Sequence, residues 1–180
     1  MGSPDVRPDA QSAGEGTPAG PRGGVVSGLA VFDVDGVVAD VRHRLHHLDR
    51  GAWHRFFRAA GDDGLLPEGA RLVADLGSRH EIVWLTGRPE WLREVTARWF
   101  AEHGLPAGEL VMRPDGDFRP APAYKLGALR RLAPRGVHAV VDDDDEVVAA
   151  ALAAGFPAVL ADWVPRTRRL RRAQDREGRT

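Results

Sequence analysis

The sequence predicts an α/β protein in which a Rossmann-like parallel sheet of about five strands is flanked by helices. Two observations support this fold class: short apolar runs of strand length alternate with helix-length patterns, and the runs are apolar almost throughout. Continuous apolar runs are typical of strands buried on both faces, and the alternation is typical of parallel strands joined by helical crossovers. Such sheets bind ligands beyond the carboxyl ends of their strands, so we expect the chemistry there.

Five apolar runs are predicted as strands, and each is followed or preceded by a helical pattern. The strand candidates lie at residues 29–34, 81–86, 110–112, 137–141 and 158–160. The helical patterns lie at about 43–60, 68–78, 89–103, 123–133 and 145–154. Crossovers of the usual hand between these strands would place helices on both faces of one sheet.

Two segments of different composition border this central part. Residues 1–27 are rich in Gly, Pro, Ser and Ala with almost no large apolar side chains, so we expect them to be disordered. Residues 165–180 are rich in arginine, and we expect a solvated tail or, less simply, a patch for a polynucleotide backbone. The expected folded domain is therefore 28–164, with helices at about 40–66 forming a small lid.

Composition excludes several classes of protein. The chain has 180 residues and no cysteine, which excludes disulfides, thiolate metal sites and a cysteine nucleophile. Its formal net charge of -1 predicts no general attraction to nucleic acid or acidic membranes. No apolar run approaches the length of a membrane span, and the N-terminus lacks the pattern of a signal peptide. We therefore expect a cytoplasmic protein that makes no membrane contact.

Aspartates follow the predicted strands where their carboxyl ends would meet. Asp33 and Asp35 close the first strand, and Asp142 and Asp143 follow the fourth. Like charges gathered in a low-dielectric cleft repel strongly, and a divalent cation would relieve that repulsion. An all-oxygen donor set suits Mg²⁺ better than zinc. The simpler alternative, capping of the next helix, is expected for Asp144 but does not explain Asp33, which lies inside an apolar run.

Four motifs at the strand ends resemble those of the haloacid-dehalogenase (HAD) superfamily. The stretch 32–38 resembles its first motif, in which two aspartates flank one residue, although Val37 stands where most members have threonine. The stretch 84–88 resembles the second motif, and 140–143 resembles the last one, which binds magnesium. Lys125, the only lysine in the chain, lies where the family keeps its charge-balancing lysine. The resemblance implies a HAD-like fold and a Mg²⁺-dependent phosphatase.

The resemblance also implies a role for each residue. Asp33 would be the nucleophile that forms an aspartyl-phosphate, and Asp35 would be the general acid and base. Thr86 and the amide of Gly87 would bind the phosphoryl oxygens, and Lys125 would balance their charge. The implied metal ligands are Asp33, Asp35 through its main-chain carbonyl, Asp142 and Asp143.

Within this superfamily, residues 31 to about 163 resemble the phosphatase domain of bacteriophage-type polynucleotide kinase–phosphatase. The matching positions are Thr86-Gly87-Arg88, the Thr-x-x-Trp of Thr96 and Trp99, and the set Arg113, Gly116-Asp117, Arg119 and Lys125. Asp144 departs from the branch, which has arginine there, and no Gly-x-x-x-x-Gly-Lys-Ser/Thr kinase loop occurs in the chain. The resemblance implies a nucleotide or polynucleotide 3′-phosphate as substrate.

Further polar residues are candidates for substrate contact, and two other functions remain open. Arg88 is placed to hold a phosphate or leaving group, Arg44 could contact substrate from the lid, and Arg113 and Asp117 could position the substrate or the lysine. The first alternative function is a phosphatase of a small metabolite or a 5′-nucleotide. The second is a binding module without turnover, which the full set of motif residues disfavours.

Three clustered histidines and five tryptophans are further candidates for a functional role. His43, His46 and His47 form a cluster in which the first and last have the spacing of a helical zinc pair, but no third ligand lies nearby. A face of the lid or a solvated helix face explains them more simply. The five tryptophans are spread along the chain and are expected in the core or the lid rather than in a platform for base stacking.

Overall fold

The sheet of the computed structural model contains all five predicted strands, each parallel to its neighbours, in the order β5-β4-β1-β6-β7. The structure describes Gly2 and residues 28–165, so the segments predicted to be a disordered N-terminus and an arginine-rich tail lie almost wholly outside the described residues. The strands are β1 (Leu29–Phe32), β4 (Glu81–Pro89), β5 (Glu109–Arg113), β6 (Val137–Asp142) and β7 (Ala158–Leu160). The predicted α/β fold is confirmed.

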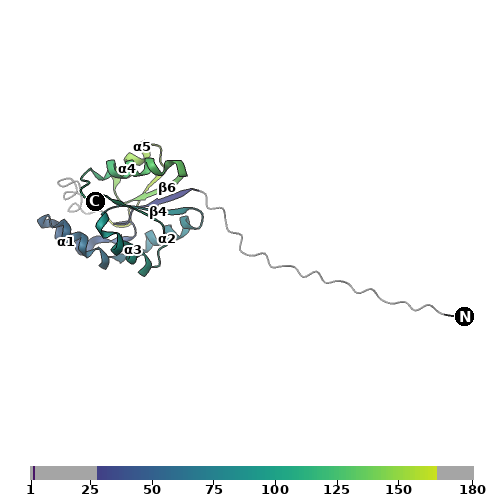
Figure 1. Cartoon of the computed structure of the whole chain (residues 1–180), viewed down its shortest axis with the longest axis horizontal. Helices are drawn as coiled ribbons and strands as arrows, with labels where there is room; N and C mark the ends of the chain where they lie inside the picture. The colour runs from purple at the N-terminus through teal and green to yellow at the C-terminus, as the bar shows by residue number, and fades with distance from the viewer. Residues whose placement is uncertain (1, 3–27, 166–180) are drawn as a thin grey trace.

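Helices cover both faces of this sheet, as Figure 1 shows. One face carries α2 (Pro67–Gly77) and α3 (Arg93–Glu102), and the other carries α4 (Ala121–Leu132) and α5 (Asp145–Ala153). The short 3-10 helices η3 (Glu90–Leu92) and η4 (Ala133–Arg135) follow β4 and α4. No helix in the part of the chain that the structure describes is long and apolar enough to cross a bilayer.

Burial on both faces explains why the central strand is apolar throughout. Successive side chains of a strand point to opposite faces of the sheet. In β1, Ala30 and Phe32 join the core cluster on the side of α2 and α3, whereas Leu29 and Val31 join the cluster on the side of α4. The strand therefore delivers whatever follows it, beginning with Asp33, to the middle of the sheet edge.

Between β1 and α2 the chain forms an insertion, residues 39–65, where a lid was predicted. The antiparallel pair β2 (Ala39–Asp40) and β3 (Gly64–Leu65) closes it, and η1 (Val41–Arg50), α1 (Trp53–Arg58) and η2 (Ala59–Asp62) lie within it. The helical pattern expected at about 43–60 is divided among η1, α1 and η2. Gly51 ends η1 at a φ of 62°, in the left-handed conformation that glycine adopts without steric cost, and α1 starts two residues later.

A small apolar core of its own fixes the insertion in place. Buried side chains of η1 and α1, among them Leu48 and Phe56, pack against Leu92 after β4 and Met112 near the end of β5. Both contact points lie toward the carboxyl ends of their strands. The insertion therefore lies beside the sheet edge where the predicted site residues collect.

Candidate active site

A buried lysine joins two aspartates from adjacent strands at the carboxyl edge of the sheet. Asp33 follows β1, Asp142 ends β6, and Lys125 comes from α4. The Nζ of Lys125 donates to Asp33 Oδ2 at 2.6 Å and to Asp142 Oδ2 at 2.7 Å. The backbone N–H of Val34 donates to Asp33 Oδ1 at 2.7 Å. These bonds hold both oxygens of the Asp33 carboxylate in a defined orientation.

A third carboxylate completes an acidic cluster, which we define as Asp33, Asp142 and Asp143. One carboxylate oxygen from each lies within 4.8 Å of the others. Gly36 makes room for this approach: its φ is 78°, and a Cβ there would lie 2.4 Å from Asp143 Oδ2. Three carboxylates around one lysine leave a surplus of negative charge, and hard oxygen donors suit Mg²⁺. The acidic cluster therefore fits a divalent cation.

Burial dominates the electrostatics of the acidic cluster. It raises the pKa of Asp33 to about 7 against the attraction of Lys125, and the nearby Asp142 adds to the rise. Burial raises the pKa of Asp142 as well. Burial alone would lower the pKa of Lys125, but Asp142 and Asp33 outweigh it and raise that pKa. The lysine therefore stays charged, while the carboxylates would gain from additional positive charge.

A second buried group of charges, which we call the arginine cluster, consists of Asp35, Arg44, Asp63 and Arg88. Asp35 Oδ1 accepts from Arg44 Nη2 at 2.9 Å and from Arg88 Nη2 at 2.6 Å. Asp63 accepts from Arg44 Nε and from Arg88 Nη2, both at 2.7 Å. Both arginine side chains are fully buried. Because Arg44 and Asp63 belong to the insertion and Arg88 to β4, the cluster ties the insertion to the sheet.

The arginine cluster determines the protonation of Asp35. Burial raises the pKa of Asp35, but the guanidinium groups of Arg44 and Arg88 outweigh burial and hold that pKa at about 2. Asp35 is therefore a carboxylate in this arrangement. Such a carboxylate has no proton to donate, and its low pKa makes it a weak base.

Sequence reasoning missed Asp63, although part of its surroundings was visible in a motif. The main-chain carbonyl of Asp63 accepts from Trp99 Nε1 at 2.8 Å, and Arg88 Nη1 donates to Thr96 Oγ1 at 3.3 Å. The Thr-x-x-Trp pattern of α3 thus supports the arginine cluster. Asp63 itself lies in an Asp-Asp-Gly stretch that resembles an ordinary turn, so no local signal distinguished it.

The remaining predicted residues lie around these two clusters. Thr86 is buried at the end of β4, and its Oγ1 accepts from the backbone N–H of Arg88 at 3.2 Å. Arg113 and Asp117 line a hollow together with Gly87, and Arg113 Nη1 donates to the carbonyl of Arg119 at 2.7 Å. The structure therefore brings Asp33, Lys125, Asp142 and Asp143 together, and places Arg44 and Arg88 against Asp35 instead.

Two further expectations concern Asp144 and the histidines. Asp144 caps α5 as predicted, because its side chain accepts from the backbone N–H of Glu146 at 3.0 Å. The ring of His43 lies 2.8 Å from Asp63 Oδ1, and the rings of His46 and His47 pack together. Among the described residues, the acidic cluster alone forms a group of three or more side chains placed to share a metal ion.

The fold and the family model that matches it define a phosphatase of the HAD superfamily. The family model described as the polynucleotide kinase PNKP phosphatase domain matches residues 28–159, and the chain belongs to this family. Comparison with curated protein sequences gives no significant match.

Solved structures resemble the chain in fold. A chain of the Pnkp1/Rnl/Hen1 complex is 21% identical with a TM-score of 0.62, covering 75% of this chain and 45% of its own length. The HAD-like hydrolase SP0104 from Streptococcus pneumoniae is 13% identical with a TM-score of 0.57, covering 83% of this chain and 91% of its own. The magnesium-bound HAD hydrolase YfnB from Bacillus subtilis is 11% identical with a TM-score of 0.54, covering 74% and 88%. The chain thus spans less than half of the matching chain in the Pnkp1 complex.

Proposed function

We propose that this chain hydrolyses phosphomonoesters with Mg²⁺ through an aspartyl-phosphate on Asp33, and that its substrate is a nucleotide or polynucleotide 3′-phosphate. The observation that carries the catalytic part is the Asp33 carboxylate, buried at the end of the central strand and oriented by Val34 N–H and Lys125 Nζ. The substrate class is supported by membership of the PNKP phosphatase family and by a neighbour described as part of an RNA repair complex.

The proposed reaction divides one displacement into two. An oxygen of Asp33 attacks phosphorus, the bond from phosphorus to the ester oxygen breaks, and the leaving oxygen takes a proton from Asp35. Water then attacks the phosphorus of the aspartyl-phosphate and gives a proton to Asp35, and the bond to Asp33 breaks to release inorganic phosphate. With its pKa held at about 2, Asp35 is in the ionised form that the second step uses, although such a carboxylate is a weak base. The first step requires a looser hold by Arg44 and Arg88, so movement of the insertion that carries Arg44 would control it.

Neighbouring groups would bind the phosphoryl oxygens and balance their charge. The hydroxyl of Thr86 and the amide of Gly87 would donate hydrogen bonds to these oxygens, and Lys125 would supply a compact positive charge beside Asp33. The proposed Mg²⁺ ligands are Asp33, Asp35 through its main-chain carbonyl, Asp142 and Asp143. A bound Mg²⁺ would neutralise charge where carboxylate and phosphate meet. The insertion would serve as the lid over this site.

The test is Mg²⁺-dependent phosphate release from 3′-phosphorylated oligonucleotides, 3′- and 5′-mononucleotides and sugar phosphates. We expect activity in Mg²⁺, loss of activity in EDTA, and the highest kcat/KM on 3′-phosphates. Asp33→Asn should lower kcat at least about a thousandfold, the scale typical for loss of a nucleophile. Asp144→Asn, which keeps a helix cap next to the acidic cluster, is the matched control. Wild-type turnover by Asp33→Asn would exclude Asp33 as the nucleophile, and a preference for sugar phosphates would exclude the 3′-phosphate substrate class.

A further inference from the structure

A hollow of about 220 Å³ adjoins the proposed phosphoryl site. Its walls come from α1 of the insertion, the end of β4, η3, the last residue of β5 and the loop 114–118. Gly87, whose amide is proposed to bind the phosphoryl group, is part of its lining. A substrate held at Gly87 by its phosphate would therefore have its leaving group next to this hollow.

Two exposed aromatic side chains line the hollow. Trp91 is 44% exposed and Phe118 is 58% exposed, and no other phenylalanine or tryptophan in the described part of the chain is among its exposed large hydrophobic residues. The ring of His54 stacks on Trp91 at 5.3 Å between centroids and 28° between planes. Phe57 meets Trp91 edge-on at 6.4 Å. Trp91 is thus supported by α1, yet much of its surface remains available to a partner.

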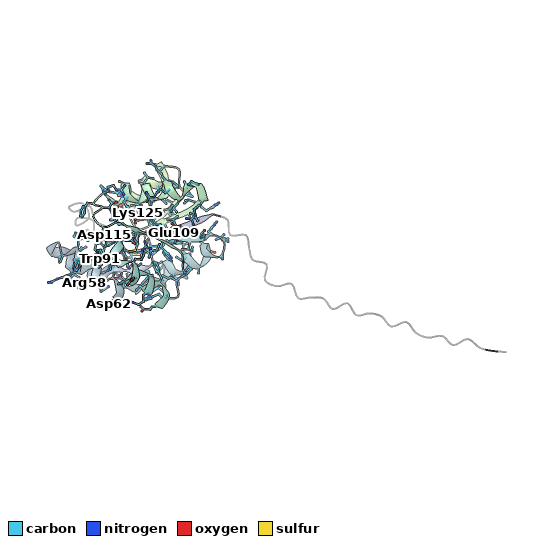
Figure 2. All side chains as sticks on the ribbon, in the orientation of Figure 1. Arg58, Asp62, Trp91, Glu109, Asp115 and Lys125 are labelled. Atoms are coloured by element: carbon cyan, nitrogen blue, oxygen red, sulfur yellow. The ribbon has the colours of Figure 1, made fainter. Side chains whose placement is uncertain are left out.

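The charges on the walls disfavour a second phosphate. Arg113 Nη1 lies 3.7 Å from Asp117 Oδ1, Asp117 is also paired with Arg119, and Asp115 adds a second carboxylate to the lining. Figure 2 shows Asp115 and Trp91 near each other on one side of the molecule. A wall without surplus positive charge beside exposed aromatic rings suits a neutral, flat, unsaturated group rather than an anionic backbone. The volume is smaller than the roughly 300–1,000 Å³ of sites for whole ligands, so it suits one part of a substrate.

We propose that this hollow binds the base of the nucleotide that carries the scissile phosphate, by stacking on Trp91 and Phe118. The proposal rests on the proposed function of the adjoining phosphoryl site and adds the feature by which that site selects a nucleotide. It also changes the expectation for one tryptophan, since Trp91 belongs to none of the three buried apolar clusters. Stacking on aromatic rings tolerates all four bases, so the selection concerns the presence of a base rather than its identity.

The test compares a nucleoside 3′-phosphate with glycerol phosphate, which carries the same reacting group and no base. For the full chain in Mg²⁺, the ratio of the two kcat/KM values should fall about tenfold in Trp91→Ala and in Phe118→Ala, within the range expected for one stacking contact. Trp91→Phe should restore most of the ratio. Leu152→Ala, at a 53% exposed side chain on α5, should keep the wild-type ratio. An equal loss on both substrates, or an unchanged ratio, would overturn the proposal.

A second readout does not need turnover. Calorimetry should show that the Kd of the nucleoside 3′-phosphate for Asp33→Asn rises about tenfold when Trp91→Ala is added. An unchanged Kd would overturn the stacking proposal even if the enzyme is active. Failure of the wild type to release phosphate from either substrate, with this rise in Kd intact, would instead overturn the proposed reaction and leave the base subsite standing.

Discussion

Asp33 and Asp35 are separated by one residue, yet they belong to two buried clusters with different charge balance. Around Asp33, two carboxylates share one lysine and a third lies close by, and burial raises the pKa of Asp33 to about 7. Around Asp35, two arginines face two aspartates, and they hold the pKa of Asp35 at about 2 although burial opposes them. In the acidic cluster the carboxylates outnumber the positive charges, whereas in the arginine cluster two arginines balance two aspartates. The first is therefore suited to bind a cation, and the second is suited to fix the insertion.

The largest expected loss of stability comes from removing one arginine of the arginine cluster. Arg88→Met would leave Asp35 and Asp63 buried with one arginine between them, and removal of one partner from a buried ion pair typically costs about 3–5 kcal/mol. Urea unfolding should show a loss of that size in the free energy of unfolding. Arg93→Met is the matched control, because Arg93 pairs with Glu90 on the surface and exposed pairs contribute about 0–1 kcal/mol. Equal losses in the two variants would mean that the arginine cluster does not hold the insertion.

Magnesium should stabilise the folded protein by binding to the acidic cluster. With free Mg²⁺ at about 100 times its Kd, binding to the folded state alone adds about 2.7 kcal/mol to the free energy of unfolding. Asp143→Asn should lose most of this gain because it removes one of the three carboxylates, and EDTA should abolish it in the wild type. The measurement is thermal unfolding with and without Mg²⁺. A full gain in Asp143→Asn would place the cation elsewhere.

These clusters also mark the limit of prediction from sequence. The strands could be predicted because burial on both faces makes them apolar, and the residues after them could be predicted because parallel strands bring their carboxyl ends to one edge. Lys125 was visible as the only lysine of the chain. Asp63 and the exposed face of Trp91 could not be predicted. Their roles depend on how residues 39–65 fold back through β2 and β3, which no periodicity in that stretch encodes.

In the metal-free protein, Asp33 and Asp35 should give the free energy of unfolding opposite dependences on pH. An ordinary aspartate has a pKa of about 3.9 in the unfolded chain. The folded pKa of Asp33 lies above this value, so the folded state holds the extra proton and stability falls as pH rises from about 4 to about 7. The folded pKa of Asp35 lies below it, so stability rises as pH increases from about 2 to about 4. Each slope is at most about 1.4 kcal/mol per pH unit for one proton.

The difference in the free energy of unfolding between wild type and Asp33→Asn gives the contribution of Asp33 between about pH 4 and 7. Urea unfolding in EDTA across this range should show a smaller decline in the variant between about pH 4 and 7, because only Asp142 then keeps a raised pKa, and an unchanged rise below it. With Mg²⁺ present, the decline should also shrink in the wild type, because the cation favours the ionised form of Asp33. If the variant keeps the wild-type decline in EDTA, burial of Asp33 is not its source.

The smallest expected effect tests where the acidic cluster ends. Asp144 directly follows Asp143, but its carboxylate binds the first turn of α5 through the N–H of Glu146. Asp144→Ala should therefore lower the free energy of unfolding by about 1 kcal/mol, the usual contribution of a helix cap, and Asp144→Asn should change it by only a few tenths. Both variants should keep the stabilisation by Mg²⁺ that Asp143→Asn loses. Loss of that stabilisation in Asp144→Ala but not in Asp144→Asn would mean that the start of α5, rather than Asp144 itself, holds Asp143 and Asp142 in position for the cation.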